Sequence, residues 1–230
     1  TRRQMSLMPI MALGLVACAA AMPASAHNVS ATDASYIEGV SGAAIGPFLY
    51  LGAKHMVTGF DHLLYLVGVL FFLSRPKDVF LYVTLFTVGH SLTLLAGVLT
   101  GLTVNAWLID AIIGFSIVYK AFENMGGFGR LGFSINTRAA VFVFGLCHGM
   151  GLATKLADFA LAEEGLVTNI LSFNVGVELG QIVALTFILL LLLRWRQGTA
   201  FRRQAFTANT WLMAGGFVLM GYQLTGYVTT

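Results

Sequence analysis

Residues 166–193 read LVTNILSFNVGVELGQIVALTFILLLLL, a long apolar stretch in which Glu178 is the one charged residue. A helix needs about 20 predominantly apolar residues to cross the hydrocarbon core of a bilayer, so this stretch is long enough. Over the whole chain 57% of the residues are hydrophobic and 10% are charged, whereas soluble domains carry about 25% charged residues. The composition therefore predicts a membrane protein.

Five further apolar stretches have a similar character, which predicts an all-α polytopic membrane helix bundle with six transmembrane helices. Residues 38–54 are apolar but rich in glycine and contain Pro47, so we expect an interfacial or re-entrant segment before the first span. The predicted spans lie near residues 57–73, 79–99, 104–122, 139–160, 166–193 and 209–228.

The first 26 residues have the pattern of a cleavable signal peptide. Arg2 and Arg3 precede an apolar stretch, and Ala24-Ser25-Ala26 resembles a cleavage site that would leave His27 at the mature N-terminus. Two alternatives are a lipobox at residues 15–18, which would place a lipid on Cys18, and a signal that is retained as an extra helix. The expected organisation is a signal peptide at 1–26, a periplasmic segment with the interfacial helix at 27–56, and a six-helix domain at 57–230.

Basic residues alternate between the predicted loops. The first, third and fifth loops contain Lys and Arg, whereas the second is uncharged and the fourth is mainly acidic. Because loops rich in Lys and Arg stay in the cytoplasm, we expect a multi-pass protein of the inner membrane with both mature termini in the periplasm. We expect the lipid bilayer to surround the protein. We expect no nucleic-acid partner, because the sequence does not combine a basic face with aromatic platforms.

Ionisable side chains lie within the predicted spans, although each costs about 2.5–3.5 kcal/mol at a helix centre. Such residues usually mark ion pathways or binding sites. Imidazole favours nickel, cobalt, copper or zinc, whereas oxygen ligands alone favour magnesium or calcium, so this mixture predicts a divalent transition-metal site. The candidate ligands are His27, His55, Asp61, His62, His90, Asp110, Cys147, His148, Asn174 and Glu178.

The geometry of the first candidates depends on Gly59. In a continuous helix, His55 and His62 would share one face, with Asp61 about 100° away from His62. A break at Gly59 would instead bring these three side chains together.

The predicted spans also place the candidates at different depths. From a rise of 1.5 Å per residue, His62 and Asp110 would lie roughly 6–9 Å below the periplasmic edge. His90, His148 and Glu178 would lie about 12–18 Å below it. This arrangement predicts a path that descends from the periplasm.

The run His55-x-x-x-Gly59-x-Asp61-His62-Leu63 resembles the signature of the HupE/UreJ family. These are hydrogenase- and urease-associated membrane proteins that are regarded as nickel permeases. The resemblance continues through residues 86–93, 144–149 and 173–181, and Met56 stands where the family often has proline. It implies passage of a metal ion, nickel above all, with handling residues His55, Asp61, His62, His90, His148 and Glu178.

The leading functional hypothesis is a secondary permease that moves a divalent cation inward, driven by the membrane potential. An alternative is a non-transporting assembly factor or accessory subunit of a metalloenzyme or respiratory complex. A second alternative is an intramembrane zinc-dependent hydrolase, although no H-E-x-x-H motif is present. We therefore do not expect an enzyme.

Overall fold

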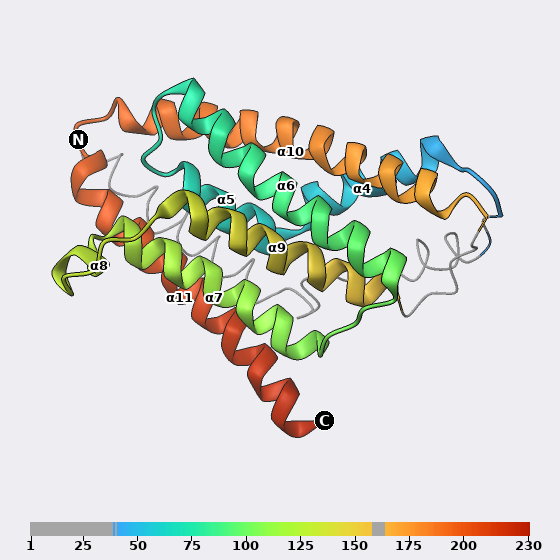
Figure 1. Ribbon diagram of the computed structural model, residues 1–230. Helices are drawn as coiled ribbons and strands as arrows, with labels where there is room; N and C mark the ends of the chain where they lie inside the picture. Colours follow the sequence, from blue (N-terminus) through green and yellow to red (C-terminus); the bar gives the residue numbers. More distant parts are fainter. Residues whose placement is uncertain (1–38, 40, 158–163) are drawn as a thin grey trace.

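The computed structural model describes residues 39, 41–157 and 164–230, and this part of the chain forms helices and no strands. Most of the helices lie side by side along one long direction (Figure 1). The all-α architecture expected from the sequence is thereby confirmed. The described helices are α4 (Ile45–Thr58), α5 (Phe60–Leu70), α6 (Pro76–Thr100), α7 (Ala106–Asn124), α8 (Gly127–Arg130), α9 (Thr137–Leu156), α10 (Leu166–Arg196) and α11 (Phe201–Thr229).

Three of the described helices, α6, α9 and α10, are long and apolar enough to cross a membrane. The outer surface of α10 is apolar, with large exposed side chains such as Val183, Phe187 and Leu190. A soluble protein rarely exposes such a continuous apolar face. These features support a membrane location for the protein.

The first helical segment lies where we expected an interfacial or re-entrant segment before a span at 57–73. The helix α4 begins at Ile45 and ends at Thr58, close to the expected boundary at residue 56. Pro47 lies in the first turn of α4, where proline costs no backbone hydrogen bond, so it marks a helix start and not an interruption. The real interruption is Gly59, which ends α4 and precedes α5.

The two short helices α4 and α5 together run parallel to α10 along its length. At one end, the backbone N–H of Ala44 donates to Asn169 Oδ1 over 2.7 Å. At the other end, the guanidinium group of Arg196 donates to the carbonyl oxygens of Phe71 and Leu73, each over 2.7 Å. The broken helix therefore extends as far as the 31-residue α10.

Glycine lets two helix pairs approach closely around the centre of the bundle. A Cβ atom on Gly176 of α10 would lie 2.0 Å from the carbonyl oxygen of Leu49 in α4. A Cβ atom on Gly149 of α9 would lie 2.0 Å from the carbonyl oxygen of His90 in α6. Small residues at such contacts are typical of helices that pack in lipid. Here they allow α4 to pack closely against α10, and α9 against α6.

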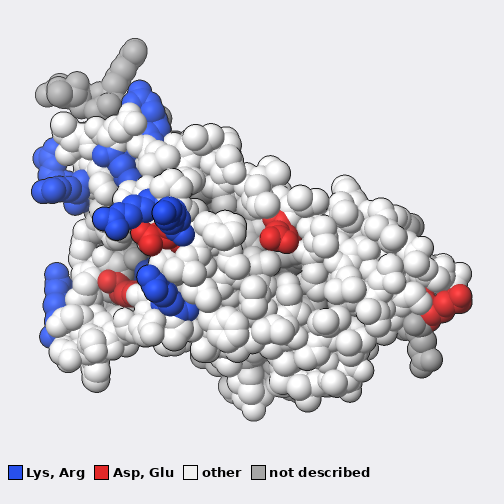
Figure 2. Space-filling view, turned by 45° about the horizontal axis from the view of Figure 1, so that its top comes forward, with Lys and Arg blue, Asp and Glu red and all other residues white. Residues whose placement is uncertain are grey.

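Lysine and arginine side chains gather at one end of the molecule (Figure 2). The α5–α6, α7–α9 and α10–α11 connections hold exposed basic residues of this kind, in agreement with the alternation expected from the sequence. The predicted signal peptide and His27 lie outside the described residues. The exposed basic residues in and beside these connections are Arg75, Lys77, Arg130, Arg138, Arg194, Arg202 and Arg203.

Candidate metal centre

Three histidines from three different helices meet in the interior of the bundle. His55 comes from α4, His62 from α5 and His90 from α6, and one ring nitrogen of each lies within 4.8 Å of the others. His62 is fully buried and His90 is 1% exposed. In the part of the chain that the structure describes, this is the one group of three or more potential metal-ligating side chains.

The break at Gly59 is what brings His55 and His62 together. Seven residues of continuous helix would separate them by about 10 Å along the axis, whereas their ring centroids are 5.1 Å apart. A Cβ atom on Gly59 would lie 2.9 Å from the His55 carbonyl oxygen and 3.0 Å from His62 Nδ1. A side chain larger than that of glycine at residue 59 would therefore displace His55 or His62.

Asp61 orients the imidazole of His62. Its Oδ1 atom lies 3.0 Å from His62 Nδ1, and the carboxylate is 2% exposed. An ionised carboxylate accepts hydrogen bonds and cannot donate them, so His62 Nδ1 carries the hydrogen. His62 Nε2 is then the nitrogen that can bind a metal ion, an arrangement that recurs in metal sites.

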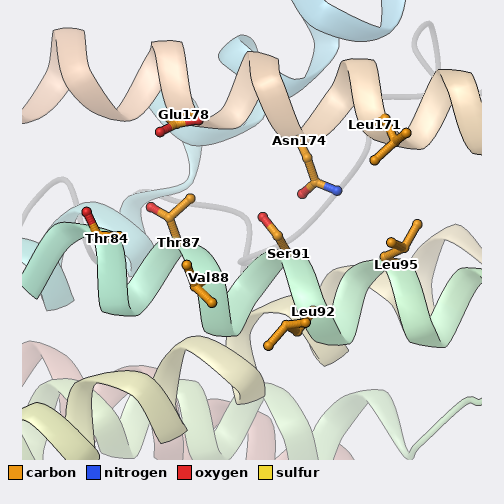
Figure 3. A pocket seen from close by; sticks show the side chains of 9 residues that line it. All are labelled: Thr84, Thr87, Val88, Ser91, Leu92, Leu95, Leu171, Asn174 and Glu178. Atoms are coloured by element: carbon orange, nitrogen blue, oxygen red, sulfur yellow. The ribbon is translucent and has the colours of Figure 1, made fainter.

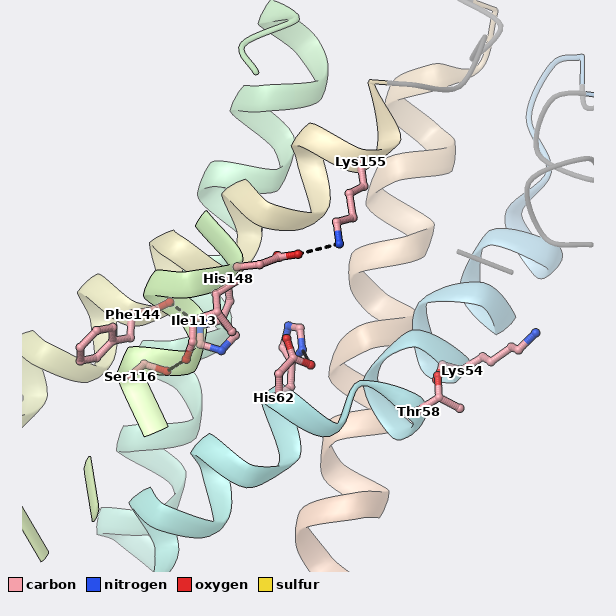
Figure 4. A network of polar contacts seen from close by, with 10 residues as sticks. Lys54, Thr58, His62, Ile113, Ser116, Phe144, His148 and Lys155 are labelled. Carbon is pink, nitrogen blue, oxygen red and sulfur yellow. Dashed lines mark hydrogen bonds and ion pairs between the residues drawn. The ribbon is translucent and has the colours of Figure 1, made fainter. Parts of the chain in front are cut away.

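His148 of α9 adds a fourth imidazole beside the three. Its ring centroid is 4.8 Å from that of His62, and Figure 4 shows both side chains projecting into the same space between the helices. His148 Nδ1 donates to the carbonyl oxygen of Phe144 over 2.7 Å. This bond fixes the ring and leaves Nε2 as its ligating nitrogen.

Aromatic side chains surround the histidines. The ring centroid of Phe86 lies 5.0 Å from that of His148, Phe173 lies 5.9 Å from His55, and Tyr65 lies 5.4 Å from His148. These rings keep the local dielectric low, which strengthens the attraction between a cation and its ligands. The sequence analysis did not include Phe86 and Tyr65 among the site residues, although each lies three or four residues from a candidate histidine and so shares its helical face.

His62 lies close to both of the histidines for which the sequence predicted a greater depth. The ring centroid of His62 is 5.5 Å from that of His90 and 4.8 Å from that of His148. The imidazoles therefore form one cluster, and the descent from the periplasm stays a prediction.

Other candidates lie outside this cluster of three. Asp110 of α7 is buried and forms an ion pair with Lys155 of α9, with 2.8 Å between Oδ2 and Nζ. Cys147 is half-buried on α9 next to His148. Lys155 lies within the last turn of α9.

Asn174 and Glu178 line a separate groove between α6 and α10 (Figure 3). Glu178 is exposed there, and Asn174 is half-buried. Gln181, the third polar residue of the stripe on α10, is buried and accepts a hydrogen bond from the Thr87 hydroxyl over 2.7 Å. The polar stripe on α10 therefore faces α6 and the outer surface.

Fold and site together define a helical membrane protein with a buried imidazole cluster behind a helix break. The chain belongs to the HupE/UreJ family: the sequence model of the HupE/UreJ proteins matches residues 31–230, which is most of its length. Comparison with curated proteins and comparison with solved structures gave no match.

Proposed function

We propose that this protein is a secondary permease that binds a divalent transition-metal ion at His55, His62 and His90. The observation that carries the proposal is that three imidazoles from three helices have nitrogen atoms within 4.8 Å of one another. A metal ion bound at about 2.0–2.1 Å holds two imidazole nitrogens roughly 3.3 Å apart. The three nitrogens, which lie within 4.8 Å of one another, would move closer together to reach that spacing.

Nickel is the ion we favour, with cobalt, copper and zinc as competitors. Neutral imidazole suits all four ions, and the resemblance of the signature motif to nickel-handling proteins selects nickel among them. Asp61 contributes negative charge beside His62, which offsets part of the charge of the ion. His148 of α9 supplies a further nitrogen ligand, to which the ion can pass from the three histidines on its way inward.

The proposed topology has six crossings, with α4 and α5 forming a single broken span. The remaining crossings are α6, α7, α9, α10 and α11. The positive-inside rule places the basic end of Figure 2 in the cytoplasm, so both mature termini are periplasmic and the membrane is the inner one. The parallel course of α4–α5 and α10 agrees with this count, because two spans separated by an odd number of crossings run in the same direction.

Transport follows from the position of the cluster on a discontinuous helix. Broken helices often hold the ions in membrane transporters, because side chains and backbone at the break can rearrange there. The membrane potential favours inward movement of a cation by about 2.3 kcal/mol per charge for each 100 mV. A divalent ion therefore needs no ATP-driven step to enter the cell.

The test is uptake of radioactive Ni²⁺ into proteoliposomes that carry the purified full chain, with an inside-negative potential. We expect His62→Gln to lose both Ni²⁺ binding and uptake, because glutamine removes the central imidazole but keeps a polar side chain. Asn209→Ala is the control, since Asn209 is buried in α11 and bonds to the Ala205 carbonyl oxygen and to Asn124. Equal uptake by wild type and His62→Gln would contradict the proposal.

The same measurements separate transport from an accessory role. Binding of Ni²⁺ that depends on His62 without uptake into vesicles would indicate a metal-binding accessory protein of a metalloenzyme. Absence of His62-dependent binding would remove both functions.

A further inference from the structure

A groove of about 330 Å³ runs between α6 and α10 on the outer surface of the bundle. Leucine and valine side chains form its apolar parts, and polar side chains from both helices face each other across it (Figure 3). The polar residues are Thr84, Thr87, Ser91, Asn174 and Glu178.

Glu178 is the one charged residue among those that line this groove. It is exposed, and it lies twelve residues into α10, about 18 Å from the start of that helix. In the proposed topology this position is near the middle of the bilayer. An ionised carboxylate there costs several kcal/mol unless a positive charge accompanies it.

The groove offers oxygen atoms and no nitrogen or sulfur ligand. Asn174 Oδ1 is buried and has no hydrogen-bond partner among the described residues, and the hydroxyls of Ser91 and Thr84 line the opposite wall of the groove, on α6. The Thr87 hydroxyl donates to Gln181 Oε1, which leaves lone pairs on Thr87 Oγ1. Oxygen ligands of this kind select hard cations, unlike the imidazoles of the metal centre.

The charge of the groove indicates a monovalent ion. One carboxylate and several neutral oxygens balance a single positive charge, whereas a divalent ion would leave an uncompensated charge in a medium of low dielectric. A proton would satisfy Glu178 through one oxygen and would leave Asn174 Oδ1 without a partner. A bound Na⁺ would use the carboxylate and the neutral oxygens together.

We propose that the groove between α6 and α10 is a Na⁺ site in which Glu178 supplies the charge and Asn174, Ser91 and the threonine hydroxyls supply neutral ligands. This site is distinct from the imidazole cluster. Binding of Na⁺ in this groove does not depend on the proposed transport function. Only the effect of Na⁺ on the divalent ion rests on that function.

The groove and the imidazole cluster are close enough to influence each other. Ser91 follows His90 directly on α6, and Asn174 follows Phe173, whose ring centroid lies 5.9 Å from that of His55. Ordering of α6 and α10 around Na⁺ therefore acts on two of the three imidazole ligands. Binding of the divalent ion becomes tighter in the presence of Na⁺.

The test uses the full chain in lipid nanodiscs without any divalent metal. We measure binding of radioactive ²²Na⁺, and the shift of the unfolding midpoint when NaCl replaces choline chloride at constant ionic strength. Wild type binds one Na⁺ per chain and is stabilised by it, Glu178→Gln loses both effects, and Ser91→Ala weakens them. Glu164→Gln is the matched control, because Glu164 is an exposed acid just before α10.

Three results would overturn the proposal: no Na⁺ binding by wild type, unchanged binding by Glu178→Gln, or a dimer that depends on Glu178 and excludes Na⁺. Loss of Ni²⁺ binding in Glu178→Gln without any effect of Na⁺ would also overturn it, and would assign Glu178 to the transition-metal path. The His62→Gln variant separates this proposal from the proposed function, because it retains Na⁺ binding whether or not the protein carries nickel.

Discussion

Asp61 and His62 are consecutive residues whose side chains bond to each other, with 3.0 Å between Asp61 Oδ1 and His62 Nδ1. Both side chains are buried in the first turn of α5. One short segment therefore supplies a metal ligand and the group that orients it. The helix break at Gly59 directs this pair toward His55 and His90.

Replacement of Asp61 by asparagine tests the role of the carboxylate. Asparagine keeps an oxygen acceptor near His62 Nδ1 but removes the negative charge, which lowers the basicity of the ligating nitrogen. Loss of such a partner typically reduces metal affinity by about 10–100-fold. We expect a decrease of this size in a competition titration with Ni²⁺, and little change for Asp78→Asn, which alters an acid in the first turn of α6. Equal affinity of Asp61→Asn and wild type would show that the carboxylate has no orienting role.

Gly59→Ala tests the geometry of the break. The added Cβ atom would lie 2.9 Å from the His55 carbonyl oxygen and 3.0 Å from His62 Nδ1, so the two histidines must move apart. We expect weaker Ni²⁺ binding with helical content preserved, measured by metal analysis and circular dichroism. Gly46→Ala is the control, because a Cβ atom there meets nothing within 4 Å. If both variants bind equally well, the break does not position the ligands.

Arg196→Ala tests how the broken helix is held against α10. The guanidinium group donates to the carbonyl oxygens of Leu70, Phe71 and Leu73 at the end of α5. Hydrogen bonds that involve a charged group contribute about 1.5–3 kcal/mol each, so we expect a clearly lower free energy of unfolding in mixed micelles. Arg194→Ala removes the same charge from an exposed position of α10 and should have a small effect. Similar losses in the two variants would indicate a general effect of charge at this end.

The helical class was predictable because apolar stretches of about 20 residues leave few alternatives in a membrane. The HupE/UreJ family was also predictable from the signature motif, and the family match confirms it. The sequence prediction took Pro47 for a break in the apolar segment before the first span, whereas Pro47 lies in the first turn of α4. Proline in a first turn and proline inside a helix give the same letter in a sequence, and only the backbone distinguishes them.

The sequence by itself determined which side chains could bind a metal ion, because residue type alone sets ligand chemistry. It also raised the break at Gly59 as an alternative to a continuous helix. Only the tertiary structure decided that His55, His62 and His90 meet while Asp110 pairs with Lys155. The physical reason is that helical periodicity fixes which residues share a face of one helix. Which faces of different helices meet depends on close contacts far apart in the chain, such as that of Gly149 with the His90 carbonyl oxygen.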